Sequence, residues 1–165
     1  ASASDAGRIV EILSNWNVVR MMRLVPHPYT EELARDWIAS HVVEREAGTA
    51  HRFAVEDEGG VVGTCDVDEI AGGVGDLGYW FDEAVWGRGY ATEAASAVVD
   101  FSFGSLGLSK LTSGHVSDNP VSGRVLDRLG FERTGEARIW SMPRACEIVQ
   151  IKYALQKEAW RSRAG

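Results

Sequence analysis

The sequence has few cysteines and no long apolar run among its 165 residues. Its two cysteines, Cys65 and Cys146, lie far apart without C-x-x-C spacing. Two free thiols in a reducing compartment are therefore expected, and a disulfide is the less favoured alternative. No apolar stretch approaches the ~20 residues of a membrane helix, and no basic segment followed by an apolar one marks a signal peptide at the N-terminus. These absences favour a cytoplasmic protein with no membrane partner.

Clustered metal ligands and excess positive charge are also lacking. No His, Cys and Asp group has metal-ligand spacing, so we predict no metal. The formal net charge of −7 argues against nucleic acid as a partner, although it permits a local basic pocket for a small anion. With 45% hydrophobic and 25% charged residues, the chain has an ordinary globular composition, and its length suits one domain.

Hydrophobic periodicity and turn signals predict a mixed arrangement of helices and strands. We expect helices at 5–14, from Thr30 to about Ala47, at about 90–106 and at 120–130, and strands at 52–57, 61–70, 74–81, 110–116, 131–142 and 145–155. Residues 156–165 are expected to be a tail, anchored if at all by Trp160. This order predicts one α+β domain over residues 1–165, with a mixed, mostly antiparallel sheet flanked by helices.

The segment from Gly78 to Glu93 has the pattern of an anion site. A strand ends near Phe81, a turn carries Gly87 and Gly89, and a helix follows. Glycines let the backbone approach a ligand, and a helix N-terminus offers unsatisfied N–H groups and partial positive charge. The segment therefore predicts a diphosphate site, with Arg88 as an added cation. Taken alone, the glycines could merely shape a turn; the segment matches neither a P-loop nor a dinucleotide fingerprint.

A second segment, from Asp118 to Phe131, makes the pattern specific. Trp86-Gly-Arg-Gly-Tyr-Ala-Thr-Glu-Ala94 resembles the coenzyme A motif of GNAT acetyltransferases, Gln/Arg-x-x-Gly-x-Gly/Ala, with Trp86 replacing the usual Gln or Arg. Asn119-x-x-Ser122 with Leu129-Gly-Phe131 resembles their second motif. The resemblance covers about residues 5–160 and is closest to the ribosomal-protein alanine acetyltransferase (RimJ/RimL-type) branch, through His27-Pro-Tyr-Thr30, Trp37-Ile38, Tyr153-Ala-Leu and Trp160.

The resemblance implies transfer of an acetyl group from acetyl-CoA, as co-substrate, to a primary amine by direct attack on the thioester. The amine would belong to a protein N-terminus or to a small molecule. The implied cofactor-binding residues are Trp80 and Phe81, through a backbone N–H at the thioester oxygen, and Trp86, Gly87, Arg88, Gly89, Tyr90, Ala91, Thr92, Asn119 and Ser122. The alternative function is a catalytically silent acyl-CoA-binding or sensor module.

The family pattern also implies individual roles. Ser122 would supply a proton to the departing thiolate, unless it only caps or lines its helix. Asn119 would hydrogen-bond the pantetheine arm, unless it only forms an Asx-turn before Pro120. His115, near the end of the predicted strand at 110–116, is the second catalytic candidate because histidine is a common general base, with a purely structural role as its alternative.

The general base and the acceptor pocket are less determined. Acidic residues lie on or beside the predicted strands, and alternation alone does not say which face the cleft; a reaction without a dedicated base also stays open. These residues are Asp66, Asp68, Glu69 and Asp76. Trp16, Tyr29 and Trp140 are the candidate acceptor-binding residues. The acidic balance of the chain favours a cationic acceptor.

The start of the chain differs from the family pattern. Family members normally begin with a β-strand, whereas this sequence opens almost directly on a helix. We therefore expect the usual first strand to be missing or replaced by another element. An uncovered sheet edge would invite pairing with a second chain, so a homodimer is one expected assembly.

Overall fold

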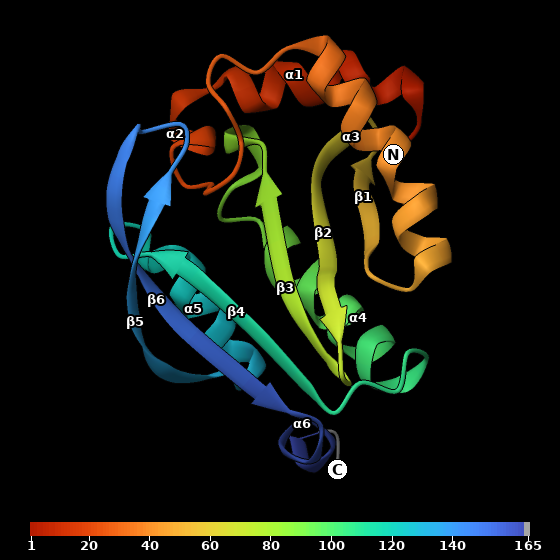
Figure 1. The fold of residues 1–165 in the computed structure, drawn as a ribbon, viewed down its shortest axis with the longest axis vertical. Coiled ribbons are helices and arrows are strands. Elements are labelled where there is room, and N and C mark those ends of the chain that lie inside the picture. Colours follow the sequence, from red (N-terminus) through yellow and green to blue (C-terminus); the bar gives the residue numbers. More distant parts are fainter. Residues whose placement is uncertain (164–165) are drawn as a thin grey trace.

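One open, six-stranded sheet forms the centre of the molecule, with helices on both faces (Figure 1). The computed structural model describes residues 1–163. In sheet order the strands are β1 (His51–Asp57), β2 (Gly60–Ala71), β3 (Val74–Phe81), β4 (Lys110–Val116), β6 (Cys146–Gln156) and β5 (Glu132–Ser141). The helices are α1 (Ala6–Ser14), α2 (Trp16–Val19), α3 (Glu31–Ala47), α4 (Tyr90–Gly104), α5 (Pro120–Leu129) and α6 (Lys157–Arg163), with short 3₁₀ turns at Ala3–Asp5 and Glu83–Val85. The predicted α+β fold is confirmed.

The pairing of β3 with β4 is the feature that shapes the site. It is the sheet's single parallel pairing, and its register ends at Asp76 opposite Thr112. Beyond that pair, β3 continues along β2 as far as Phe81, while β4 continues along β6 as far as Val116. The two strands therefore separate after a short contact, and Figure 1 shows them meeting at one end and diverging toward the other. Beyond this contact, the backbone N–H and C=O groups of β3 and β4 that face each other are not paired with one another, as they would be in a continuous sheet.

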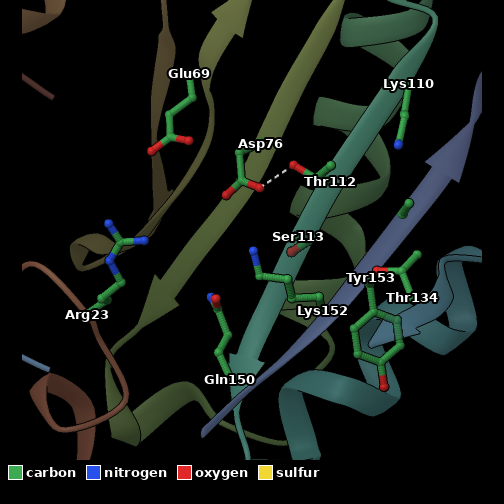
Figure 2. Close-up of a pocket in the computed structure, with 11 residues that line it drawn as sticks. Arg23, Glu69, Asp76, Lys110, Thr112, Ser113, Thr134, Gln150, Lys152 and Tyr153 are labelled. Atoms are coloured by element: carbon green, nitrogen blue, oxygen red, sulfur yellow. Dashed lines mark hydrogen bonds between the residues drawn. The ribbon is translucent and has the colours of Figure 1, made fainter. Parts of the chain in front are cut away.

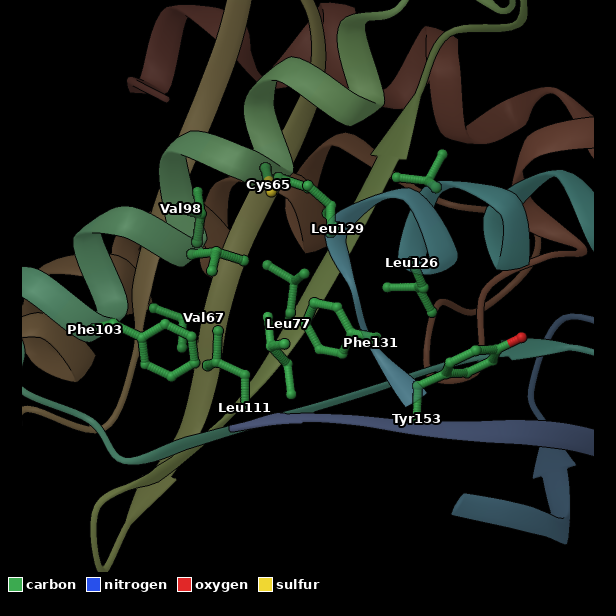
Figure 3. Packing of buried hydrophobic residues seen from close by; sticks show 14 of the residues in the cluster. Cys65, Val67, Leu77, Val98, Phe103, Leu111, Leu126, Leu129, Phe131 and Tyr153 are labelled. Carbon is green, nitrogen blue, oxygen red and sulfur yellow. The ribbon is translucent and has the colours of Figure 1, made fainter. Parts of the chain in front are cut away.

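The two faces of the sheet bury different clusters, because successive side chains on a strand point to opposite faces. Leu77 on β3 and Leu111 on β4 pack with α4 and α5 in the main core (Figure 3). Trp80 on β3 points the other way and packs with α1 and α3. Opposite sides of β3 therefore lie against different pairs of helices.

The C-terminal segment differs from the prediction of a tail. Residues 157–163 form helix α6, while residues 164–165 lie outside the described part. Trp160 holds the helix in place: its Nε1 donates to Asp100 Oδ1 at 2.7 Å, and its ring packs against the main core. Trp160 therefore anchors the segment that was predicted as a tail, and this segment is helical through residue 163. Short helix α2 was also missed, because four residues carry too little periodicity.

Within residues 1–163, β1 and β5 form the two edges of the sheet, and no strand precedes α1. Cys65 is buried and Cys146 exposed, and both are free. None of the described helices combines the length and apolarity needed to cross a membrane. No group of three or more His, Cys, Asp and Glu side chains in the same range could hold a metal ion.

Candidate active site

A glycine-bearing turn joins the end of β3 to α4. Gly87 and Gly89 have φ values of 76° and 90°, which L side chains rarely adopt. A Cβ added at either glycine would meet nothing within 4 Å, so the turn presents bare backbone to open space. The Trp86 indole Nε1 donates to the Phe81 carbonyl at 3.0 Å and closes the turn. In place of the family's usual Gln or Arg, Trp86 thus contributes a side-chain bond to the turn itself.

The N-terminus of α4 is open to a ligand. Gly89 is its N-cap and supplies no side-chain hydrogen bond, whereas Thr30 caps α3 and Asn119 caps α5. First-turn N–H groups without a cap need another partner, and an anion suits both the donors and the helix dipole. The turn and the first turn of α4 therefore fit a diphosphate. The structure brings together the cofactor residues predicted at 86–92, which are contiguous in sequence.

Arg88 lies within this turn, between the two glycines. It is exposed and lines a separate hollow of about 460 Å³. That hollow also contains Arg8, Asp57 and Asp82, and Arg8 is paired with Asp82. Arg88 therefore has acidic as well as basic neighbours.

Ser122 is held by a residue that sequence analysis missed. The Tyr79 hydroxyl lies 2.9 Å from Ser122 Oγ and 3.1 Å from the Ser122 carbonyl oxygen, to which it can donate. Tyr79 is on β3, beyond the last residue paired with β4, and Ser122 is in the first turn of α5, so the bond bridges the separated strands. Burial raises the pKa of Tyr79, which keeps the phenol protonated. In sequence, Tyr79 between Leu77 and Phe81 is indistinguishable from a core residue.

Asn119 and His115 have clear structural contacts. Asn119 Oδ1 accepts from Ser122 N at 3.4 Å and caps α5, which matches the Asx-turn alternative; a pantetheine contact stays a prediction. His115 lies on the α5 side of the sheet, with its ring 5.6 Å from that of Tyr153. A Cβ on Gly123 of α5 would come within 2.7 Å of His115 Nε2. His115 is therefore packed against α5.

The opposite face of the sheet carries a polar hollow of about 270 Å³ at the β3–β4 contact (Figure 2). Thr112 Oγ1 donates to Asp76 Oδ1, and burial raises the pKa of this carboxyl. No protein hydrogen bond is made to the other carboxylate oxygen of Asp76 within the described residues. The lining residues are Arg23, Glu69, Asp76, Lys110, Thr112, Ser113, Thr134, Gln150, Lys152, Tyr153 and Ala154.

The structure sorts the four acidic candidates into two pairs. Asp66 and Asp68 both accept from Arg52 Nη1, at 3.4 Å and 3.0 Å, so they are engaged in ion pairs. Glu69 and Asp76 line the hollow instead. Strict alternation would place Glu69 on the α4 side with Val67, but the β2–β3 register shifts here and Glu69 adopts a φ of 49°. The irregularity turns Glu69 toward the hollow.

The three predicted acceptor residues lie outside this hollow. Tyr29 is buried with α1 and α3, and Trp16 packs near His27 with ring centroids 5.3 Å apart. Trp140 is exposed on β5, near the hairpin tip where Met142 N donates to the Arg23 carbonyl at 2.9 Å. The residues that do line the hollow come from six segments, the α2–α3 loop and strands β2 to β6, so nothing in the linear sequence indicates their assembly.

Comparison with known proteins agrees with this geometry. The acetyltransferase (GNAT) domain family matches residues 1–132. An uncharacterized N-acetyltransferase, p20 of Bacillus licheniformis, is 28% identical over 160 residues, covering 94% of this chain and 89% of that protein. Ribosomal-protein-S5-alanine acetyltransferase from Vibrio fischeri shares the fold with a TM-score of 0.83 at 23% identity, covering 97% of this chain and 92% of that one. RimJ of Mycobacterium smegmatis, in complex with CoA-disulfide, gives a TM-score of 0.86 at 18% identity, covering 96% of this chain and 80% of that one.

The expected resemblance is thus confirmed in sequence and in fold. Family members named as N-acetyltransferases match nearly the whole chain, and the uncapped turn and helix fit their co-substrate. The chain belongs to the GNAT acetyltransferase domain family and is an acetyl-CoA-dependent N-acetyltransferase.

Proposed function

We propose that acetyl-CoA binds from the α4–α5 side, that a primary amine enters the hollow on the other face, and that the two meet where β3 leaves β4. The observation that carries the proposal is the position of Asp76 and Thr112, the last β3–β4 register pair, at the wall of the hollow. Tyr79 and Ser122 lie just beyond this pair on the opposite face. The complex of RimJ with CoA-disulfide supports coenzyme A binding by a protein of this fold.

Four groups have roles in this proposal. Acetyl-CoA supplies the thioester. Asp76, with a raised pKa and one free carboxylate oxygen, accepts the proton that the attacking amine loses. A backbone N–H near Trp80 and Phe81 donates to the thioester oxygen as charge develops there. Ser122, with its hydroxyl oriented by Tyr79, donates a proton to the departing sulfur.

The acceptor amine must be neutral to attack. An α-amino group has a pKa of about 7.7–8.0 against about 10.4 for lysine, so it needs less help from a base. Both a protein N-terminus and a small-molecule amine satisfy this chemistry. A cytoplasmic location and a homodimer also remain predictions.

The first test is calorimetric titration with acetyl-CoA and with CoA, on the wild type and on Gly89→Trp. We expect micromolar binding by the wild type and at least ~100-fold weaker binding by the variant, because the indole would fill the turn that receives the diphosphate. Gly107→Trp is the matched control. Gly107 lies just past the other end of α4, also has a positive φ of 69°, and has open space around its Cβ position.

A screen of amines for thiol release then separates the enzyme from a silent binding module. Binding with transfer to at least one amine supports the proposal, whereas binding without transfer favours the silent module. Absence of binding by folded wild-type protein would reject the coenzyme site.

A further inference from the structure

The charges around the hollow indicate what the acceptor carries besides its amine. Figure 2 shows the Arg23 guanidinium, the Glu69 and Asp76 carboxylates and the Lys152 ammonium directed toward one shared space. Among residues 1–163, none of these four side chains forms an ion pair within 4.0 Å. Lys152 is nevertheless close enough to Asp76 to oppose the rise in the pKa of that carboxyl.

These charges of both signs are assembled from distant segments. Arg23 comes from the loop between α2 and α3, where its carbonyl is bound by Met142 N at 2.9 Å. Lys152 projects from β6, opposite Gly114 of β4 in the register. Glu69 reaches the hollow through the irregular end of β2, where φ is 49°. Bulges and positive φ at a non-glycine residue commonly aim a functional side chain.

The charge balance discriminates between classes of amine. A purely cationic acceptor such as a polyamine would find Glu69 and Asp76, but it would also face the positive charges of Arg23 and Lys152. An acceptor with a neutral body would leave Arg23 and Lys152 without a partner, as well as Lys110, a third cation in the same lining. A molecule with an amine and an anion would satisfy both signs, and like-charge contacts would reject the alternatives.

Resting on the function proposed above, we propose that the acceptor is a primary amine that also bears an anionic group, a carboxylate or a phosphate. The amine lies by Asp76, and the anion lies by Arg23 and Lys152. The hollow of about 270 Å³ equals roughly nine water molecules in volume. It therefore holds a small molecule or the first residues of an acidic peptide, two sources that share this chemistry.

The test compares matched acceptors by thiol release: γ-aminobutyrate, n-butylamine and putrescine, which present an anionic, a neutral and a cationic end on similar chains. Alanyl-glutamate amide and alanyl-glutamine amide form the peptide arm. We expect kcat/KM to be at least about ten-fold higher for the anionic member of one or both arms. A larger preference for the anionic member among the small amines indicates a small-molecule acceptor, and a larger preference among the peptides indicates an acidic peptide.

Charge reversal at the hollow provides the second readout. In Lys152→Glu and Arg23→Glu we expect the preference for the anionic acceptor to fall at least about ten-fold, with acetyl-CoA affinity unchanged by calorimetry. Both side chains are exposed, so folding should survive, and Arg161→Glu on α6 is the control for the same charge change away from the hollow. Equal or better transfer to the neutral and cationic acceptors overturns this inference alone. Failure to bind acetyl-CoA, or to release thiol with any amine, overturns the proposed function and this inference with it.

Discussion

At the residue scale, the hydrogen bond between Tyr79 and Ser122 links β3 to α5 across the separated strands. The phenol can donate either to the Ser122 carbonyl or to Ser122 Oγ. When it donates to Oγ, the serine hydroxyl hydrogen is left for another acceptor. If Ser122 acts as proposed, Tyr79 is a positioning residue for it, and the pair should act as one unit.

Ser122→Ala should lower kcat about 100-fold, because a positioned proton donor contributes roughly 10²–10⁴-fold to such a step. Tyr79→Phe should lower kcat about ten-fold, and the double variant should resemble Ser122→Ala, since the tyrosine acts through the serine. Steady-state kinetics with saturating acetyl-CoA measure these values, and KM for acetyl-CoA should change little.

Ser102→Ala is the matched control, since the Ser102 hydroxyl also lies on a helix but is buried and donates to the Val98 carbonyl at 2.7 Å within α4. Additive losses from Tyr79→Phe and Ser122→Ala would show independent roles. An unchanged kcat in Ser122→Ala would remove the serine from the chemistry.

At the scale of elements, one arginine connects the β5–β6 hairpin, the end of α2 and the loop that precedes α5. Arg144 in the β5–β6 hairpin donates to the Arg20 carbonyl at 2.7 Å and to both carboxylate oxygens of Asp118 at 2.9 Å. Asp118 also pairs with the Arg20 side chain at 3.1 Å. Hydrogen bonding to Arg144 lowers the pKa of Asp118. The network fixes the loop that precedes Asn119 and Ser122.

Arg144→Ala should therefore raise KM for acetyl-CoA several-fold and destabilise the fold by about 1 kcal/mol, since the lost bonds are charge-assisted but partly exposed. Kinetics and urea unfolding measure the two effects. Arg133→Ala is the control from the same hairpin, because its pair with Glu136 is exposed on both sides and should contribute at most about 0.5 kcal/mol. Equal effects of the two substitutions would contradict a specific role for the network.

At the scale of the whole molecule, a buried carboxyl makes stability depend on pH. Asp66 is nearly buried, and its Oδ1 has no hydrogen-bond partner. Burial raises its pKa from 3.8 to about 7, despite the opposing effect of Arg52. Between pH 3.8 and about 7, the Asp66 carboxyl is protonated in the folded state but ionised in the unfolded chain. The contribution of Asp66 to the free energy of unfolding is therefore greatest below pH 3.8 and decreases as the pH rises to about 7.

Asp66→Asn should accordingly gain stability relative to the wild type as the pH rises from about 5 to about 7.5, by at most about 3 kcal/mol over this range at ~1.4 kcal/mol per pKa unit. Urea unfolding of both proteins at each pH gives the difference. Asp36→Asn, which changes an exposed carboxylate on α3, is the control. A constant difference across this range would show that Asp66 is ionised throughout.

Most of the fold and the conformation of the glycine turn before α4 could be predicted because they depend on local sequence. Gly87 and Gly89 have the positive φ that only glycine adopts readily, and the helix start at Tyr90 follows directly. The hollow could not be predicted in the same way. Glu69 would have been assigned to the wrong face by strict alternation, because the bulge that turns it depends on pairing with β3.

The sequence by itself determined the order of the longer helices and the strands, though not α2 and α6, as well as the family and the glycine turn before α4, since each is encoded in contiguous residues whose conformational needs are local. Only the tertiary structure decided which carboxylates line the hollow and which residue hydrogen-bonds Ser122. Asp66 and Asp68 pair with Arg52, which leaves Glu69 and Asp76 to the hollow. Side-chain direction at such positions is set by strand register and by contacts between distant segments. Neither can be predicted from the residues adjacent in sequence.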